Sequence, residues 1–384
     1  MSTIKDIFLI DKIFSAEENF KKSNNMSIKN LSHWNSSDAF KKHMSQHLLL
    51  PKASLPWDYS YTYSIAECEK IAVLLNLGVP IECMNSTMCL FLQSSTIAII
   101  NMINFLVQHK KKKLCILQPS YFSVISCCKM FSLDYGIEYI DFVQQTPTIP
   151  INNILLNGYD CVWITSPIYS TSCYFNETQI EEINKLKMLG ITIIFDESLA
   201  LQGKEMVRDF PVGNNVFAIY SPHKAISING LKFSVIVCSN EYEDFFDQWV
   251  DIFSGSLLCS NKDAISHYTS SNYSQKCLPA YVSYITETKN VISDIVRKYP
   301  SIFLLENTYG HYLSVFTNLK ITNDEDIYKL ICNIIKECCV SFLPGSINGF
   351  DDRKGLSFRI NLTSDSLELP EYVDRVLGYI DANH

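Results

Sequence analysis

Lys224 is the residue best placed to take part in a reaction, because it lies in a short polar loop between two apolar segments. Residues 216–220 and 233–238 both have the composition of buried strands. An ammonium group held there would lose solvation, which lowers its pKa and leaves a neutral amine able to form a Schiff base. The alternative is a lysine at a loop tip that reaches into water, and the loop alone does not decide between the two.

Two further positions have polar groups where a helix begins or a strand ends. Ser94, Ser95 and Thr96 open a helix-like segment, where hydroxyls and free backbone N–H groups would hold a phosphate. An ordinary helix N-cap is the alternative. Asp196 ends an apolar run, and its carboxylate would either pair with a buried cation, such as a protonated pyridine nitrogen, or cap a turn.

An aromatic residue and an arginine complete the set. Tyr121, after Pro119 at another helix start, could stack on a flat ring or be a packed aromatic side chain. Arg359 alternates with Phe358 and Ile360, so it points away from their face and could clamp a carboxylate with two hydrogen bonds. An exposed arginine is the alternative. Together these residues describe an amino-acid site that uses pyridoxal phosphate.

The elements around these residues indicate an α/β fold. Apolar strand-like runs alternate with helix-like segments, and the runs lie at 89–92, 114–117, 137–142, 161–165, 191–195, 216–220 and 233–238. This pattern predicts a mostly parallel sheet covered by helices on both faces. Ligands bind at the carboxyl ends of strands in such sheets. The residues that follow such runs are Ser94, Tyr121, Ser166, Asp196 and Ser221, which predicts one shared site.

We divide the chain into three parts. Residues 1–50 are polar, with isolated apolar anchors, and we interpret them as an N-terminal arm that contributes to a small domain and to a substrate gate. Residues 51–265 form the large cofactor-binding domain. Residues 266–384 mix long helices with a few strands and form a smaller α+β domain.

Composition limits the classes of function. The 384 residues are 47% hydrophobic and 19% charged, so we expect an obligate oligomer that hides apolar surface. A net charge of −8 argues against nucleic-acid binding. None of the 14 cysteines stands in a Cys-x-x-Cys pair, which favours buried reduced thiols over disulfides or zinc. Residues 1–9 lack signal-peptide features and no apolar run reaches membrane-spanning length, so we expect a soluble cytoplasmic protein without a membrane partner.

The order and spacing of these motifs resemble the class I/II aminotransferase family of the fold type I pyridoxal-phosphate enzymes, over residues 30–380. Ser221-x-x-Lys224 followed by Gly230-Leu231-Lys232 is similar to the family signature Ser-x-x-Lys…Gly-x-Arg. The resemblance implies that Lys224 holds pyridoxal 5′-phosphate as an internal aldimine and moves the substrate α-proton. It also implies the roles of other residues: phosphate binding by Ser94, Ser95, Thr96, Ser221 and Lys232, ring stacking by Tyr121, a carboxylate of Asp196 that keeps the ring nitrogen protonated, carboxylate binding by Arg359, and contact with the partner subunit's phosphate by Tyr59.

Several positions depart from the family pattern. The family's Asn-Pro-x-Asn-Pro-Thr-Gly segment is Ser-Pro-Ile-Tyr-Ser-Thr-Ser at residues 166–172, so Tyr169 stands where an asparagine usually contacts the ring hydroxyl. Leu199 replaces the tyrosine three residues after the acid, and Lys232 replaces the phosphate arginine. The phenol of Tyr169 is a candidate to supply the missing contact. These changes affect the expected reaction type more than the expected cofactor.

We therefore predict a homodimeric enzyme with shared active sites that moves an amino group between an α-amino acid and a 2-oxo acid, in a specialised, secondary-metabolic pathway. One alternative keeps the cofactor and changes the chemistry to that of a lyase, decarboxylase, C–C bond-forming enzyme or oxidase. Another is a degenerate relative that acts as a regulator or scaffold without the cofactor.

Overall fold

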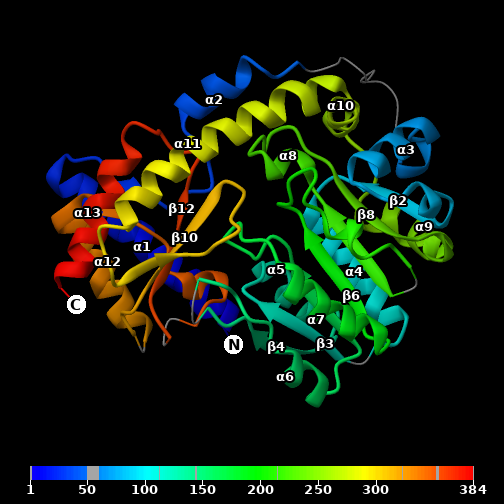
Figure 1. The fold of residues 1–384 in the computed structure, drawn as a ribbon, viewed down its shortest axis with the longest axis horizontal. Helices are drawn as coiled ribbons and strands as arrows, with labels where there is room; N and C mark the ends of the chain where they lie inside the picture. Colours follow the sequence, from blue (N-terminus) through cyan, green and yellow to red (C-terminus); the bar gives the residue numbers. More distant parts are fainter. Residues whose placement is uncertain are drawn as a thin grey trace.

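A computed structural model describes residues 2–49, 60–111, 113–142, 145–213, 215–321, 323–351 and 354–383. Figure 1 shows its helices and strands in two groups, with a large sheet in one and a small sheet in the other. The α-helices are α1 Ser2–Asn24, α2 Asp38–Ser45, α3 Glu67–Asn76, α4 Ser95–Gln108, α5 Phe122–Met130, α6 Ile151–Leu156, α7 Glu177–Met188, α8 Pro222–Ala225, α9 Glu243–Phe253, α10 Cys259–Tyr268, α11 Leu278–Val296, α12 Asp324–Cys338 and α13 Leu369–Ala382.

In the described part of the chain, the large sheet has seven strands in the order β2-β8-β7-β6-β5-β3-β4. Strand β8 is antiparallel to both of its neighbours and the other pairs are parallel. The strands are β2 Thr87–Leu92, β3 Lys113–Gln118, β4 Asp134–Tyr139, β5 Cys161–Thr165, β6 Thr192–Glu197, β7 Val216–Tyr220 and β8 Ser234–Ser239. The mostly parallel sheet predicted from the apolar runs is confirmed.

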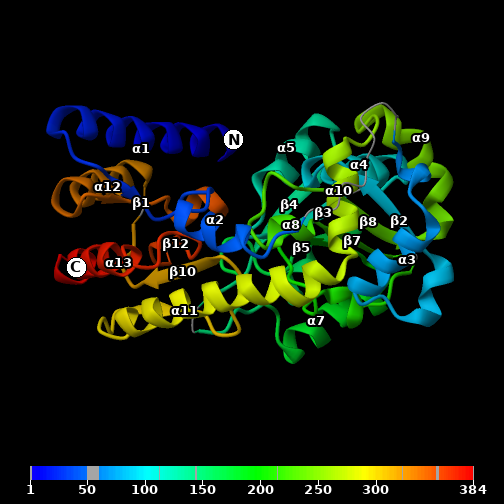
Figure 2. The same ribbon diagram turned by 90° about the horizontal axis from the view of Figure 1, so that it is seen from above.

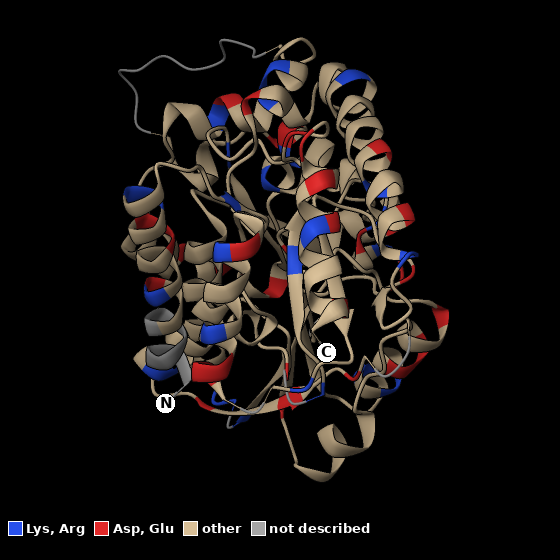
Figure 3. Ribbon diagram, turned by 90° about the vertical axis from the view of Figure 1, so that its left-hand side faces the viewer, with Lys and Arg blue, Asp and Glu red and all other residues tan. Residues whose placement is uncertain are grey.

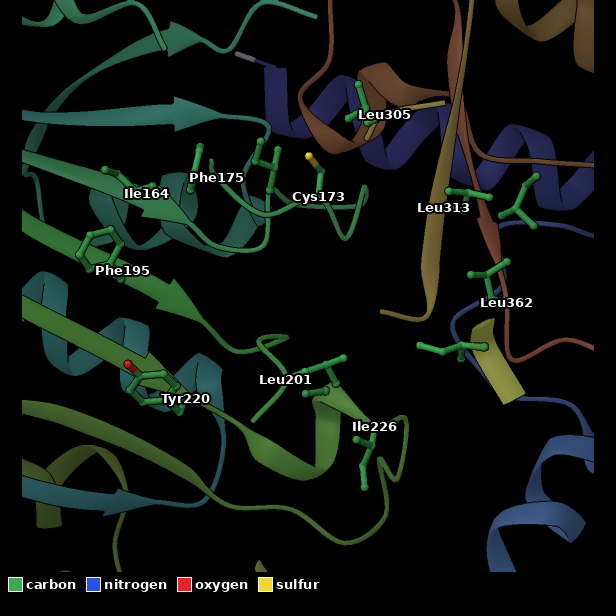
Figure 4. Packing of buried hydrophobic residues seen from close by; sticks show 14 of the residues in the cluster. Ile164, Cys173, Phe175, Phe195, Leu201, Tyr220, Ile226, Leu305, Leu313 and Leu362 are labelled. Carbon is green, nitrogen blue, oxygen red and sulfur yellow. The ribbon is translucent and has the colours of Figure 1, made fainter. Parts of the chain in front are cut away.

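Both faces of this sheet are buried, because alternate residues of each strand enter different cores. In β6, Ile193 and Phe195 lie in one hydrophobic cluster, whereas Ile194 lies in the other, which includes α4, α5 and α9. The first cluster continues into the small sheet, and Figure 4 shows Phe195 in the large sheet and Leu313 beyond the strand ends as parts of it. One continuous core therefore joins the two groups of elements.

The small sheet is antiparallel in the order β12-β10-β9, with β9 Ile302–Leu304, β10 Tyr312–Thr317 and β12 Ser357–Asn361. Helix α11 runs from beside the large sheet to the small one (Figure 1). The N-terminal segment joins this second group: α1 packs on α12, and β1 Lys29–Asn30 pairs in parallel with β11 Val340–Ser341. Figure 2 shows α1 alongside α12. The boundaries at residues 50 and 265 stay a prediction.

Most elements expected from the sequence are present, including the long helices of residues 266–384, such as α12. The largest difference is α1, a helix of 23 residues where we expected a polar arm. A second correction concerns Lys224, which lies on the one-turn helix α8 and not in a loop, because Pro222 at its first turn presets the helical backbone.

The charged residues and the cysteines are spread over the described part of the chain. Positive and negative residues alternate along the helices in Figure 3. All 14 cysteines are described and free, and nine are buried. The described residues contain no group of three or more side chains suited to a metal ion. No helix among them has the length and apolarity needed to cross a membrane.

Candidate active site

A small polar cavity of about 180 Å³ lies at the N-terminus of α4, beside α8. Six of its lining residues are ones that the sequence suggested for cofactor binding. The full lining is Ser94, Ser95, Thr96, Ser221, Lys224, Asn229, Lys232 and Ser234. The structure thus brings together hydroxyls and lysines from three separate parts of the sequence.

Local structure explains why these residues meet. Ser94 is the N-cap of α4, and its hydroxyl accepts a long hydrogen bond of 3.4 Å from the backbone N–H of Ile97. The α4 N-terminus therefore presents backbone N–H groups and a partial positive charge next to the cavity. Across the cavity, the Ser221 and Ser234 hydroxyls hydrogen-bond at 2.5 Å. Both features favour an anion.

Lys224 is one of the residues that line this cavity. Its Nζ donates to Ser95 Oγ at 3.5 Å and lies 5.4 Å from the centre of the Tyr121 ring. Burial lowers the pKa of Lys224, while the carboxylate of Asp196 acts in the opposite direction. A larger fraction of the amine is therefore neutral than in water, as nucleophilic attack on a carbonyl requires.

Asp196 is buried at the carboxyl end of β6, opposite Thr165 of β5. Its Oδ1 accepts hydrogen bonds from the backbone N–H of Ser198 at 3.2 Å and from the Ser198 hydroxyl at 2.6 Å. The Ser120, Thr165 and Ser166 hydroxyls are buried without a hydrogen-bond partner among the described residues. Buried hydroxyls without partners are costly unless a ligand satisfies them, and these three follow or end strands β3 and β5.

Tyr121 and Tyr169 lie next to each other, with ring centres 5.9 Å apart. Burial raises the pKa of Tyr169 to about 12, although the charge of Arg359 and a hydrogen bond with it offset part of the rise. The Tyr169 phenol is therefore associated with Arg359, the residue expected to bind a substrate carboxylate.

Arg359 on β12 is buried, with 1% of its surface exposed, and so is not the exposed strand arginine that was the alternative. Its Nε and one terminal nitrogen donate to the Ser32 carbonyl at 3.4 and 3.3 Å, and the other terminal nitrogen donates to Ser170 Oγ at 3.2 Å. The guanidinium also lies 4.3 Å from the Tyr312 ring centre and 5.3 Å from that of Trp34.

Tyr59, expected to reach the partner subunit, lies outside the described residues. Other residues at the site were not expected from the sequence, namely Ser32, Trp34, Ser170, Asn229, Ser234, His311 and Tyr312. Asn229 and Ser234 flank Gly230-Leu231-Lys232, so their position in that motif was an available signal. No local pattern marks Ser32 or Trp34, because their neighbour Arg359 is more than 300 residues away.

No protein-family model matches the chain, and no curated protein matches it by sequence. Solved structures do. A methionine aminotransferase from Escherichia coli has a TM-score of 0.74 at 12% identity, with 95% of this chain and 97% of that one covered. Alanine aminotransferase from Pyrococcus furiosus has a TM-score of 0.72 at 16% identity, with 97% of each chain covered.

The chain has the fold of these aminotransferases. Cystalysin from Treponema denticola, which contains a pyridoxal 5′-phosphate cofactor, shares it as well, with a TM-score of 0.68 at 14% identity over 96% of this chain and 95% of that one. The fold expected from the motifs is thereby confirmed over nearly the whole length of the chain.

Proposed function

We propose that the chain is a pyridoxal-phosphate-dependent enzyme that transfers an amino group between an α-amino acid and a 2-oxo acid. The observation that carries this proposal is the polar cavity in which Lys224 lies beside the serines and Lys232. Hydroxyls, a helix N-terminus and two lysines suit a phosphate monoester, a compact dianion that accepts several hydrogen bonds. The fold shared with cystalysin supports the choice of cofactor.

The donor set around the cavity fits the rest of the cofactor. Asp196 is a buried carboxylate suited to a protonated ring nitrogen, Tyr121 offers a ring face beside Lys224, and the unsatisfied Thr165 and Ser166 hydroxyls suit polar ring substituents. When bound, the cofactor supplies an aldehyde that joins an amine and a ring that withdraws electrons. The phosphate would be held by Ser94, Ser95, Thr96, Ser221 and Lys232.

Lys224 and Arg359 would act on different parts of the substrate, the α-proton and the α-carboxylate. The Lys224 Nζ would act as the base that takes the proton from the substrate α-carbon, because burial favours its neutral form. Arg359 would orient the α-carboxylate, and Tyr169 would support Arg359 through the hydrogen bond between them. Holding both ends of the substrate fixes the α-proton relative to the amine.

A second candidate is a carbon–sulfur lyase, which the shared fold of cystalysin and of a C–S lyase from Staphylococcus hominis favours. It would use the same Lys224 and Asp196 but release a product without regenerating an amino acid. Decarboxylase, C–C bond-forming and oxidase reactions are further variants on the same residues.

We further propose a cytoplasmic homodimer that works in a specialised pathway. The buried free thiols suit a reducing compartment. The departures from the family pattern at Tyr169, Leu199 and Lys232 favour a specialised substrate over a central one.

The decisive experiment is the visible spectrum of the protein with pyridoxal phosphate, before and after sodium borohydride. We expect an absorbance band that borohydride removes and a cofactor mass fixed on the Lys224 peptide. Lys224→Ala should bind no cofactor covalently, whereas Lys276→Ala, which changes an exposed lysine, should behave like the wild type.

Incubation with single amino acids then separates the candidate reactions. Conversion of the cofactor to its pyridoxamine form, with a 2-oxo acid released, supports amino-group transfer. Release of sulfide from cysteine, or of homocysteine from cystathionine, without that conversion would identify the lyase instead. A protein that is not labelled by borohydride at Lys224 would refute both.

A further inference from the structure

The N-terminal segment supplies an aromatic side chain to the arginine end of the candidate active site. Trp34 lies 5.3 Å from the Arg359 guanidinium, which Tyr312 approaches to 4.3 Å. Unlike Tyr312, which is buried, Trp34 is 45% exposed. Trp34, whose ring also contacts Phe14 edge-on at 6.3 Å, is therefore partly exposed beside a deeply buried cation.

The position of Trp34 is fixed by its backbone neighbours. Ser32 Oγ donates to the Arg359 carbonyl at 2.7 Å and accepts from the Leu343 backbone N–H at 3.0 Å. The Asn361 side-chain amide donates to the His33 carbonyl at 2.8 Å, and the Asn361 backbone N–H donates to the Leu31 carbonyl at 2.8 Å. Residues 31–34 are thus held firmly on β12, so the indole is exposed but well placed.

The three direct bonds from Arg359 to Ser32 and Ser170 use three of the five N–H donors of a guanidinium. One donor remains on each terminal nitrogen, for Tyr169 and for a substrate carboxylate. Since the three bonds are 3.2–3.4 Å long, beyond the usual 2.9–3.0 Å, they are weak enough to readjust when an anion arrives.

Aromatic rings line the route from this arginine to the reactive amine. Tyr169 associates with Arg359, its ring lies 5.9 Å from that of Tyr121, and the latter lies 5.4 Å from Lys224 Nζ. A substrate that bridges Arg359 and Lys224 would therefore lie along Tyr169 and Tyr121, with Trp34 beside its arginine-bound end.

We propose that Trp34 determines substrate specificity and that the substrate is an α-amino acid with an aromatic side chain, which packs on the exposed indole. This inference rests on the proposed function and names the substrate class of the same site. Burial of a phenyl group between aromatic neighbours favours such a substrate over alanine.

The test compares the holoenzyme, loaded with pyridoxal phosphate, with its Trp34→Ala and Trp34→Phe variants. For the wild type we expect kcat/KM to be about 100-fold higher with L-phenylalanine than with L-alanine. Trp34→Ala should reduce this ratio at least about tenfold, mainly because kcat/KM for L-phenylalanine falls. Trp34→Phe should keep the ratio within about threefold of the wild-type value. Trp34→Leu replaces the alanine variant if that one does not fold.

A binding measurement separates recognition from catalysis. Calorimetry with 3-phenylpropanoate, which has the carboxylate and ring but no amine, should give tighter binding than propanoate does. The ratio of the propanoate and 3-phenylpropanoate dissociation constants should shrink at least about tenfold in Trp34→Ala.

The outcomes distinguish this inference from the proposed function. Failure of borohydride to label Lys224 would refute the proposed function. Two results would refute only the role of Trp34. One is a labelled enzyme that shows no preference for L-phenylalanine, and the other is a Trp34→Ala variant in which kcat/KM falls equally for both substrates.

Discussion

At the scale of single residues, the site combines buried charges with neutral histidines. Asp196 is held by Ser198 and acts on Lys224, while Arg359 is buried between two rings. Such charges are costly to bury and are retained where a ligand or a reaction uses them. His223 and His311, close to Lys224 in the sequence or in space, stay uncharged instead.

Asp196→Asn tests the proposed ring-nitrogen partner. The amide keeps an oxygen for Ser198 but carries no charge to hold a protonated nitrogen, so we expect kcat to fall about 100-fold or more. Amino-group transfer and the content of bound cofactor are measured together. Asp209→Asn, at an exposed carboxylate, serves as the control. An Asp196→Asn enzyme within about threefold of the wild type would contradict the assignment.

The buried histidines predict loss of stability in acid. Burial lowers the pKa of His223 to about 3, with His267 beside it, and that of His311 to about 3, near Arg359 and Lys224. Protonation therefore favours the unfolded state, where histidine has a pKa of about 6.5. Stability is complete above that pH and falls below it by about 1.4 kcal/mol per pH unit for each histidine.

Urea unfolding at pH 7 and pH 5 measures this effect. Between pH 7 and pH 5, the free energy of unfolding of His223→Gln should fall by about 2 kcal/mol less than that of the wild type, because the substitution removes one of the groups that titrate. His33→Gln, at an exposed histidine, should lose as much as the wild type. Equal losses in all three proteins would show that His223 does not contribute.

At the scale of elements, tight turns hold the strand ends that make up the site. Gly349 has a φ of +91° and follows a short helical turn, and a Cβ there would overlap the Gln118 side-chain oxygen and approach Pro119 Cα to 3.4 Å. Gln118 in turn accepts the Ser120 backbone N–H at 2.8 Å. The small sheet's loop thus contacts the segment that leads into Tyr121.

Gly349→Ala should therefore destabilise the protein by more than backbone strain alone. Gly190, with a φ of +82° and open space around its Cβ position, provides the matched control. We expect Gly190→Ala to cost about 1 kcal/mol and Gly349→Ala about 1–2 kcal/mol more, measured by urea unfolding. Equal effects of the two substitutions would mean that the Gln118 side chain moves aside freely.

Local pattern predicted the elements better than the site. The apolar strands of the large sheet and α12 were predictable, because buried strands and amphipathic helices have recognisable patterns of apolar residues in the sequence. Helix α1 was missed because its polar composition hides two buried anchors, Leu9 and Ile13, which are buried only once the helix has docked. The placement of Trp34 was unpredictable for the same reason, since it depends on tertiary contacts.

At the scale of the whole molecule, exposed apolar residues indicate where a second copy would bind. Ile71 and Leu75 lie one turn apart on α3 and are 40% and 48% exposed, and Ile81 nearby is 75% exposed. Apolar residues gathered in this way usually mark an interface. A shared interface there would agree with the proposed homodimer.

Sedimentation tests that interface. We expect the wild type to sediment as a dimer and the Ile71→Asp, Leu75→Asp double variant as a monomer of 43.9 kDa, because buried unpaired carboxylates oppose association. Leu367→Asp, at a 90% exposed position, should remain dimeric. A monomeric wild type would refute the dimer, and a dimeric double variant would place its interface elsewhere.

The hydrogen bond between Ser32 and Arg359 joins positions 327 residues apart. During synthesis, the early segment emerges from the ribosome long before its partner strand, by roughly 15–65 seconds at usual translation speeds. For that interval Leu9 and Ile13 have no core to enter, so a nascent chain would expose them to chaperones. The proposed carboxylate-binding end of the site therefore takes shape only as the last strand is made.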